Sequence, residues 1–393
     1  MERKTVEEND NSRPEHDEHQ QSTECIAWET LLADYDLHEP SHIVTSILKA
    51  GGIEPSYRPQ FWCHELLCTE QATKNPDLYQ SLLLLPISDR NKKCIEIDLP
   101  RTYKKLNPER QKVLFRVLKA IAVFHPPIGY CQGMNFVTGM ILLAGLREEV
   151  SPLVLLSFWP SSSVLFLSRA NVLPFSTLSS SFVTSLLLAS FVVTLIFFFF
   201  FFFFIFFFLF SSLPTNNIQN ISIQKEAFWA FTSLNKRYAI GDLFLKGLPG
   251  LTKPLADLEK ALSEHLPQLS KHFELEDLPP RMIGTKWFLA LFGTCLPSTL
   301  ALLVWDCLLF CGWDAVLAAA LAILHTFHDT LLNQRFDEML PFLGTNLYTL
   351  LKTDECSQRL FRLHFAHYIN LFFLSKATTA THHNSHCAQQ VHS

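Results

Sequence analysis

An uncharged run of about thirty residues limits how this chain can fold more than any other feature. Residues 182–210 contain no charged side chain and include the sequence IFFFFFFFFIFFFLF. A helix that crosses a lipid bilayer needs only about twenty apolar residues, so this run taken alone predicts a transmembrane helix. It lies inside a low-complexity segment, residues 150–224, that is rich in Ser, Leu and Phe. This apolar segment divides the rest of the chain into two parts.

Both flanking parts have the residue pattern of a helical globular domain. Residues 24–149 and 225–352 mix apolar and charged side chains, and their apolar residues recur at spacings of three and four, as on the buried face of a helix. Alternation typical of strands is scarce, so we expect an all-α fold that the apolar segment interrupts. Residues 1–23 are polar and acidic and predict a disordered tail, and residues 353–393 are expected to form a polar C-terminal extension.

The first flanking part contains a predicted pair of helices. Asn107 followed by Pro108 is typical of a helix start, and an apolar stripe follows over residues 113–122. A His-Pro-Pro sequence at residues 125–127 ends this helix. The second helix of the pair is expected over residues 130–146.

Charge and cysteine content exclude several classes of protein. The 393 residues carry a net charge of −5, so no global basic field attracts nucleic acid. The ten cysteines form no CxxC pair and no obvious disulfide framework, which favours the reducing cytoplasm as the location. No histidine stands at zinc-ligand spacing beside Cys307 and Cys311, so we expect no metal site. The polar N-terminus does not resemble a secretory signal peptide.

Three short motifs before the apolar segment carry candidate functional residues. In the first, Arg58 stands one helical turn before Trp62. The second reads IEIDLPR, in which Asp98 precedes Arg101 by three residues, so its carboxylate can hold the guanidinium if the backbone turns there. The third reads GYCQGMN and places Gln132 before a glycine. Its amide both donates and accepts hydrogen bonds, so it can orient a water molecule.

Together these motifs resemble the three signature motifs of the TBC family of Rab GTPase-activating proteins. The matching residues are Arg58 and Trp62, then Ile95, Asp98 and Arg101, then Tyr130, Gln132 and Gly133. The resemblance continues after the apolar segment in EAFWAF, in TKWFLALFGTCLP and in VWDCLLFCGWD, which contains Trp305 and Asp306. It covers residues 39–351 apart from the apolar segment, and it implies a TBC-domain helical fold of two helical subdomains.

The resemblance also implies a function. The family acts on Rab-type GTPases in vesicle trafficking, and the partner holds GTP and Mg²⁺, so no cofactor of this chain's own is expected. Arg101 would be an arginine finger, and Gln132 would be a second finger that orients the attacking water. Asp98 would orient Arg101, Tyr130 would help pack the loop that carries Gln132, and Gly133 would be a further supporting residue. Phosphoryl transfer gains rate from a positive group and an aimed water. The structural residues of the motifs would be Arg58, Trp62, Ile95, Trp305 and Asp306.

The family fold also bears on the apolar segment. A single crossing would put the two flanking parts on opposite sides of a bilayer, although they must pack as one domain. Membrane contact therefore stays open, either through residues 182–210 or indirectly through a lipidated GTPase. A further hypothesis is that residues 150–224 are encoded by a retained intron. Removing them restores a short charged connection between two helices, and the codons of Val150 and Gln224 can supply the GT and AG that mark the two ends of an intron.

Three functional hypotheses follow from these residues. The chain is an activator of a GTPase rather than an enzyme with its own substrate, or a membrane-anchored adaptor that binds a GTPase without activating it, or an inactive isoform that the apolar segment disrupts. The intact Arg101 and Gln132 favour the activator, because a pure binder needs neither finger. The segment itself favours the inactive isoform.

Overall fold

Helices provide all the regular structure in the part of the chain that the computed structural model describes, which is residues 28–35, 38–103, 107–145 and 215–376. None of these residues lies in a strand, so the all-α prediction is confirmed. The chain divides into two units, Met1–Leu146 with Gln224–Ser393 and Arg147–Ile223. The predicted membrane span at residues 182–210 and the tail at residues 1–23 lie outside the described residues.

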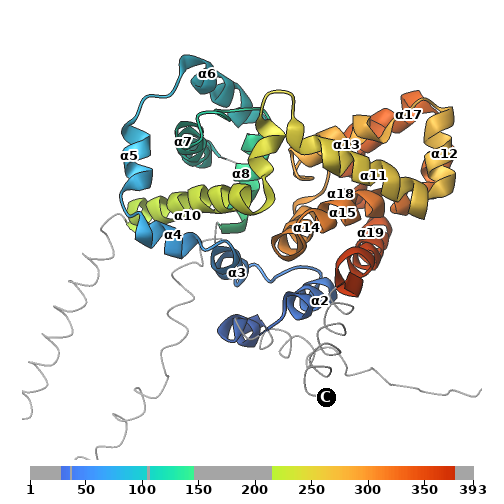
Figure 1. Ribbon diagram of the computed structural model, residues 1–393, viewed down its shortest axis with the longest axis horizontal. Helices are drawn as coiled ribbons and strands as arrows, with labels where there is room; N and C mark the ends of the chain where they lie inside the picture. The colour runs from blue at the N-terminus through green and yellow to red at the C-terminus, as the bar shows by residue number, and fades with distance from the viewer. Residues whose placement is uncertain (1–27, 36–37, 104–106, 146–214, 377–393) are drawn as a thin grey trace, which may run out of the picture. The chain divides into compact units, whose positions relative to one another are not determined.

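Residues 28–33 are helical, and the labelled helices that follow run from α2 to α8, with the short 3₁₀ segment η2 among them (Figure 1). They are α2 (Pro40–Ala50), α3 (Arg58–Glu65), α4 (Cys68–Lys74), α5 (Leu78–Leu84), α6 (Asp89–Asp98), η2 (Leu99–Arg101), α7 (Pro108–Phe124) and α8 (Met134–Gly145).

The helices after the segment run from α10 to α19, with short 3₁₀ and π-helical segments among them. They are α10 (Thr215–Tyr238), η5 (Ile240–Phe244), η6 (Pro249–Leu251), α11 (Thr252–His265), α12 (Pro267–Leu275), α13 (Pro280–Leu289), α14 (Ser298–Cys311), α15 (Trp313–Thr326), α16 (His328–Leu332), α17 (Phe336–Pro341), η7 (Phe342–Asn346), α18 (Leu347–Thr353), α19 (Glu355–Ile369) and η8 (Asn370–Leu374).

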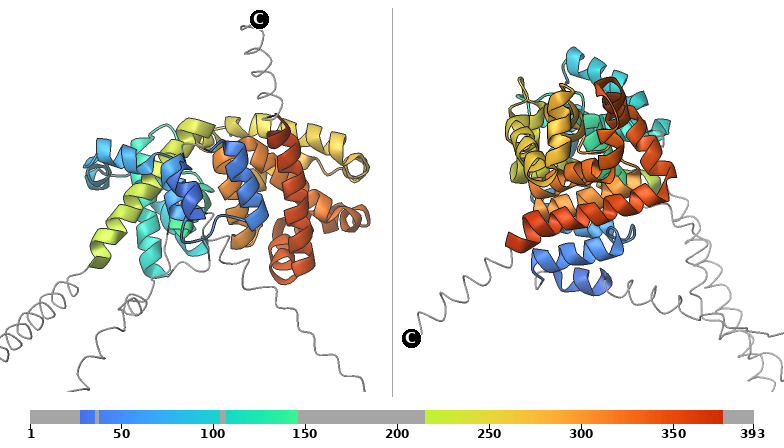
Figure 2. Two further views of the ribbon diagram at one scale, coloured as in Figure 1. Left: turned by 90° about the horizontal axis from the view of Figure 1, so that it is seen from below. Right: turned by 90° about the vertical axis from the view of Figure 1, so that its right-hand side faces the viewer.

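The helices form two groups, as the family resemblance implies. Helices α4 to α8 gather around α10, whereas α11 to α19 surround α14 and α15 (Figures 1 and 2). Most residues of α14 and α15 are buried, as expected of helices that are largely apolar. Gly312 joins them with a φ of 58°, a conformation that glycine adopts without steric strain. This buried pair is the centre of the second group, and α2 packs onto α14.

Helix α7 begins and ends where the sequence predicts. The Asn107 side chain accepts a hydrogen bond from the Arg110 N–H at 2.9 Å, and Pro108 occupies the first turn. His125 caps the other end. The apolar stripe faces the core through its buried residues Leu114, Val117, Leu118, Ile121 and Ala122.

Two boundaries differ from those expected from the sequence. The C-terminal extension predicted from residue 353 begins instead with α19, which buries Phe361, Phe365, Tyr368 and Ile369 against the helical core. Helix α10 begins at Thr215, inside the predicted apolar segment, and Gln224 is buried and accepts a hydrogen bond from the Tyr79 hydroxyl at 3.0 Å. In α19, polar and charged residues around the phenylalanines conceal the buried face in the sequence.

Candidate functional site

Arg101 stands at the end of a short 3₁₀ segment that continues α6. Ser88 caps α6 at its start, and the buried residues of this helix are Ile95 and Asp98. Pro100 lies in the 3₁₀ segment η2, which turns the backbone so that Arg101 faces back towards Asp98. The Arg101 side chain is 54% exposed, whereas that of Asp98 is 4% exposed. A buried carboxylate thus holds a guanidinium that stays open to solvent.

Asp98 joins this turn to the loop that precedes α8. Its Oδ1 atom accepts a hydrogen bond from Arg101 Nε at 2.7 Å and a second, shorter one from Arg101 Nη2. Its Oδ2 atom accepts a hydrogen bond from the Tyr130 hydroxyl at 2.6 Å. Burial and the bond to Asp98 raise the pKa of Tyr130, so its hydroxyl remains a donor at neutral pH. The Asp98 carboxylate therefore fixes both Arg101 and Tyr130, which lies two positions before Gln132.

Gly133, the residue that follows Gln132, shapes the loop that carries Gln132. Gly133 has a φ of 109°, and a Cβ atom there would come within 2.9 Å of the Leu289 carbonyl oxygen, so only glycine fits. Gln132 itself is exposed. The predicted second helix was expected from residue 130, but α8 begins at Met134, because the positive φ of Gly133 interrupts helical geometry.

Two residues that the sequence analysis did not single out complete this site. Asn135 is fully buried, and its Nδ2 atom donates a hydrogen bond to Thr102 Oγ1 at 2.8 Å. Thr102, also buried, donates to the Asp98 carbonyl oxygen at 2.8 Å. Asn135 belongs to the GYCQGMN motif, and a polar side chain at the start of an apolar helix was the available signal. We name Asp98, Arg101, Thr102, Tyr130 and Asn135, together with Gln132, the finger site.

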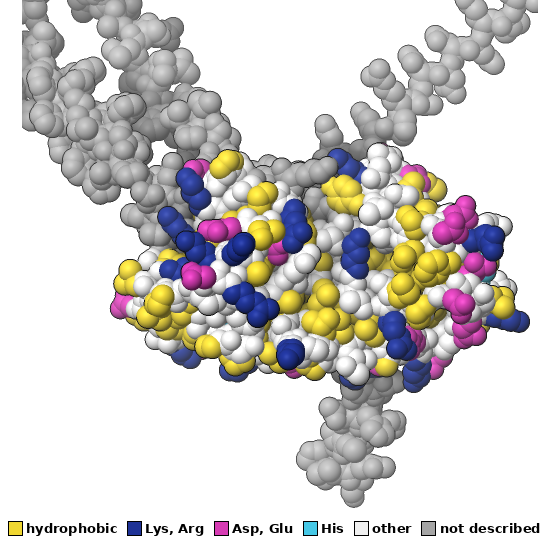
Figure 3. All heavy atoms as spheres, turned by 90° about the horizontal axis from the view of Figure 1, so that it is seen from above, with side chains coloured by type: hydrophobic (Ala, Val, Ile, Leu, Met, Phe, Trp, Pro, Cys, Tyr) yellow, Lys and Arg dark blue, Asp and Glu magenta, His cyan; other side chains and the backbone are white. Residues whose placement is uncertain are grey.

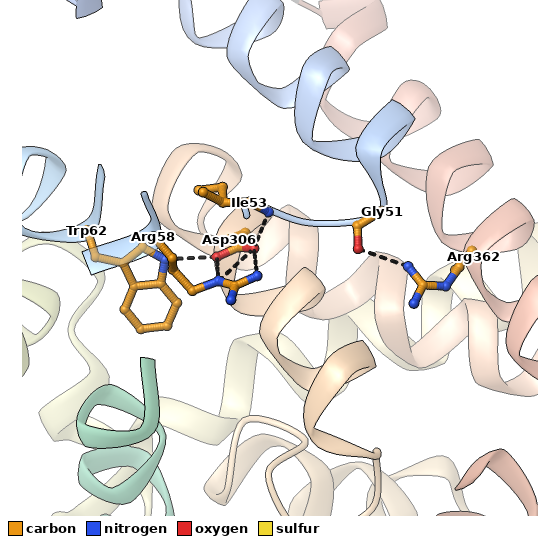
Figure 4. Close-up of polar contacts among 6 residues, drawn as sticks. All are labelled: Gly51, Ile53, Arg58, Trp62, Asp306 and Arg362. Carbon is orange, nitrogen blue, oxygen red and sulfur yellow. Dashed lines mark hydrogen bonds and ion pairs between the residues drawn. The ribbon is translucent and has the colours of Figure 1, made fainter. Parts of the chain in front are cut away.

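The other predicted motif residues form a second, buried cluster around Asp306 (Figure 4). Arg58 and Trp62 point to Asp306 from α3: Arg58 Nε donates to Oδ1 at 2.9 Å, and Trp62 Nε1 donates to the same oxygen at 2.8 Å. The Ile53 N–H donates to Oδ2 at 2.8 Å. Trp62 also stacks on Trp305 with ring centroids 5.6 Å apart. Because α3 and α14 supply the partners, this cluster ties the N-terminal helices to the C-terminal group.

The Asp306 cluster has the character of a structural site. Asp306 is fully buried and Arg58 is 7% exposed. Full burial raises the pKa of Asp306, and the Arg58 guanidinium and the Ile53 and Trp62 donors act in the opposite direction. Arg58, Trp62, Trp305 and Asp306 are all buried, and their structural role stays a prediction.

Basic side chains are exposed on α6 and α7, the helices on either side of the turn that carries Arg101. Figure 3 shows Lys and Arg side chains on the left of the face seen from above, with Asp and Glu side chains among them. Arg90, Lys92 and Lys93 of α6 and Arg116 of α7 are exposed. Such a surface favours the approach of an anionic group.

Comparison with a known family decides the identity of the domain. The family model for the Rab-GTPase-TBC domain matches residues 55–188 and 181–332 of this chain, and these ranges contain the finger site and all of the Asp306 cluster except Ile53. The chain belongs to the RabGAP-TBC family. The resemblance that the three motifs predict is thereby confirmed.

Relatives of this TBC chain include two proteins from well-separated organisms. GTPase-activating protein GYP5 of Saccharomyces cerevisiae is 24% identical over 324 residues, which are 82% of this chain and 27% of that protein. Rab GTPase-activating protein eat-17 of Caenorhabditis elegans is 24% identical over 337 residues, which are 84% of this chain and 29% of that protein. The matched region thus spans somewhat more than a quarter of the length of these relatives.

Two solved structures share the fold of this TBC chain. The Ypt/Rab-GAP domain of Gyp1p has a TM-score of 0.63 and 16% identity, with 90% of this chain and 99% of that chain covered. A Chlamydomonas flagellar RabGAP TBC domain has a TM-score of 0.60 and 18% identity, with 88% and 91% covered. The expected TBC-domain helical fold is therefore confirmed. Within the described residues, no helix has both the length and the apolar character that a bilayer crossing requires.

Proposed function

We propose that this TBC chain stimulates GTP hydrolysis by a Rab-type GTPase, with Arg101 and Gln132 entering the site of the partner. GTP and Mg²⁺ belong to the GTPase, so the chain is an activator without a cofactor of its own, and it acts in the cytoplasm. One observation carries the proposal. The buried Asp98 carboxylate holds both the exposed Arg101 and the tyrosine beside Gln132, so two exposed groups are presented together on a fixed support.

The chemistry of phosphoryl transfer explains why these two groups serve the reaction. Negative charge spreads over the transferred γ-phosphoryl group and the leaving oxygen, and a guanidinium placed there stabilises it. An arginine finger supplied by a partner raises the rate by about 10³ to 10⁵. An amide both donates and accepts hydrogen bonds, so Gln132 can aim the attacking water at the phosphorus. The basic side chains of α6 and α7 add a favourable field for a nucleotide-bearing partner.

A stimulated hydrolysis assay tests the proposal. The full chain is mixed with a panel of purified Rab-type GTPases loaded with GTP, and phosphate release is followed. The parent chain accelerates release by at least one GTPase, and Arg101→Ala and Gln132→Ala each lose most of that acceleration, by about 10³-fold for the arginine. Arg359→Ala removes an exposed arginine from α19 and serves as the matched control, which retains the parent rate.

The same assay separates the activator from the adaptor. An adaptor binds the GTP-loaded GTPase but leaves its hydrolysis rate unchanged, so binding measured without acceleration contradicts the proposal. Acceleration that survives in both Arg101→Ala and Gln132→Ala shows instead that other groups perform the chemistry.

A further inference from the structure

We infer that Asn135 is a positioning residue that fixes the two fingers relative to each other. It does so by bonding the residue that follows each finger, Thr102 after Arg101 and Gly133 after Gln132. The inference rests on the proposed function, because the spacing of the fingers matters only if both enter one GTPase site.

The contacts of Asn135 run to both loops of the finger site. Its Nδ2 atom donates to Thr102 Oγ1 at 2.8 Å, and its Oδ1 atom accepts the Gly133 N–H at 3.1 Å. Asn135 is fully buried, and Thr102 is 1% exposed. Water therefore does not compete for these hydrogen bonds. An amide is suited to this position because it supplies one donor and one acceptor at the end of a short side chain.

The network closes on the carboxylate that holds the arginine. The Thr102 hydroxyl accepts from Asn135 and donates to the Asp98 carbonyl oxygen at 2.8 Å. Asp98 in turn binds Arg101 and Tyr130 through its side chain. The loops are thus joined twice, once through the Asp98 carboxylate and once through Asn135. Each finger lies between the two joints.

A neighbouring contact gives the two loops a third connection. The Tyr103 hydroxyl donates to the Phe136 carbonyl oxygen at 3.0 Å, and the Tyr103 ring lies so close to Gly139 that a Cβ atom there would come within 2.9 Å of it. Tyr103 anchors the backbone and would keep the loops associated after loss of the Asn135 bonds. Removing those bonds is therefore expected to loosen the spacing of the fingers without separating the loops. A misplacement of about 1 Å at a catalytic group lowers a rate by about 10²-fold.

Three threonine substitutions test this role. Thr102→Val keeps the shape of the side chain but removes the hydroxyl that Asn135 binds, and Thr102→Ser restores the hydroxyl. The matched control is Thr138→Val, in the same helix as Asn135. Thr138 is fully buried, and its hydroxyl has no hydrogen-bond partner among the described residues. The full chain and its variants are assayed with a GTP-loaded Rab-type GTPase that the parent chain stimulates.

The expected result is a selective loss of maximal rate. Thr102→Val lowers kcat for stimulated hydrolysis by about 10- to 100-fold and leaves KM for the GTPase within about twofold, since the docking surface is unchanged. Thr102→Ser recovers most of the parent kcat, and Thr138→Val keeps it. A parent kcat in Thr102→Val, or equal losses in Thr102→Val and Thr138→Val, overturns the inference.

Amide hydrogen exchange keeps the test independent of the GTPase and of folding defects. In the parent chain the Gly133 N–H exchanges slowly, because a buried oxygen accepts it, and Thr102→Val accelerates exchange across residues 129–135 whereas Thr138→Val does not. Fast exchange at Gly133 in the parent overturns the inference even if no variant folds. If the parent stimulates no GTPase but this exchange pattern is found, the proposed function fails and the coupling of the loops stands.

Discussion

Two aspartates of this domain hold arginines for opposite purposes. Asp306 binds Arg58 where both side chains are removed from solvent, at 0% and 9% exposure. Asp98 is equally hidden, but its partner Arg101 has a side chain that is 54% exposed. The buried pair has no access to a ligand and joins α3 to α14. The half-exposed pair keeps one guanidinium edge occupied and leaves the remaining donors free to meet a phosphoryl group, which is the arrangement a finger requires.

Removing the charge from Asp306 is expected to destabilise the fold strongly. Asp306→Asn keeps the shape of the side chain but leaves the buried Arg58 guanidinium without an anion, which costs about 3–5 kcal/mol. Chemical denaturation of the variant measures this change. Asp314→Asn is the control, because Asp314 pairs with Lys376 at the surface, where the two side chains are 35% and 69% exposed, and such pairs contribute about 0–1 kcal/mol. Equal stabilities for the two variants would contradict the structural role of Asp306.

Replacing Arg101 by lysine is expected to abolish most of the stimulation while leaving the domain folded. Lysine keeps the positive charge and can still pair with Asp98, but an ammonium cannot hold a carboxylate with one edge and a phosphoryl group with another. We expect Arg101→Lys to be nearly as slow as Arg101→Ala in phosphate release. Its free energy of unfolding should change by no more than about 0.5 kcal/mol, as for other surface positions. A lysine variant as fast as the parent would show that charge alone is sufficient.

At the scale of elements, the sequence predicts what local patterns encode. Helix α7 is predicted correctly because an N-cap, a proline and an apolar stripe act over a few residues. The pairing of Asp98 with Arg101 follows from a spacing of three. The start of α8 could not be predicted, because the contact of Gly133 with the Leu289 carbonyl oxygen joins residues far apart in sequence. Helix α19 could not be predicted for the same reason, because its phenylalanines are buried by packing on α15, which is distant in sequence.

The packing of α19 on α15 is expected to weaken in acid. His325 of α15 stacks on His364 of α19 with ring centroids 3.8 Å apart. Burial, together with nearby histidines, lowers the pKa of His364 to about 4 and also lowers the pKa of His325. An unfolded histidine has a pKa of about 6.5, so between pH 6.5 and 4 the unfolded chain binds more protons. Stability from this pair is therefore complete above pH 6.5 and is lost as the pH falls towards 4.

A thermal unfolding series across this pH range measures the effect. The melting temperature of the parent chain should fall between pH 6.5 and 4, and His364→Gln should reduce that fall, because its side chain takes up no proton. His42→Gln is the control: His42 also stacks on a histidine, His38, but at 5.0 Å and on the exposed side of α2. A His364→Gln variant whose melting temperature falls as steeply as that of the parent would exclude the histidine pair as the cause.

At the scale of the whole molecule, the helical unit continues on both sides of the apolar segment. Among the described side chains, residues of α10 from Gln224 onward contact the N-terminal helices. Phe228 is fully buried and packs edge-on to Phe124 with ring centroids 5.4 Å apart, and Lys225 donates to the Pro76 carbonyl oxygen at 3.0 Å. Before these residues, the described contact to the core is the hydrogen bond from Tyr79 to Gln224. Gln224, Lys225 and Phe228 therefore hold α10 to the N-terminal helices.

Deleting residues 150–224 is expected to leave the domain folded and able to stimulate a GTPase. The deletion joins Glu149 to Lys225 and retains every described contact of α10 except the Tyr79–Gln224 hydrogen bond. Deletion of residues 150–223 is the matched variant, because it keeps Gln224, and it should be more stable by about 1 kcal/mol, the usual contribution of one hydrogen bond. Circular dichroism, denaturant unfolding and phosphate release compare both variants with the full chain. Both variants keep every residue from Lys225 onward. Loss of helical signal in both deletions would therefore mean that the apolar segment contributes to the fold.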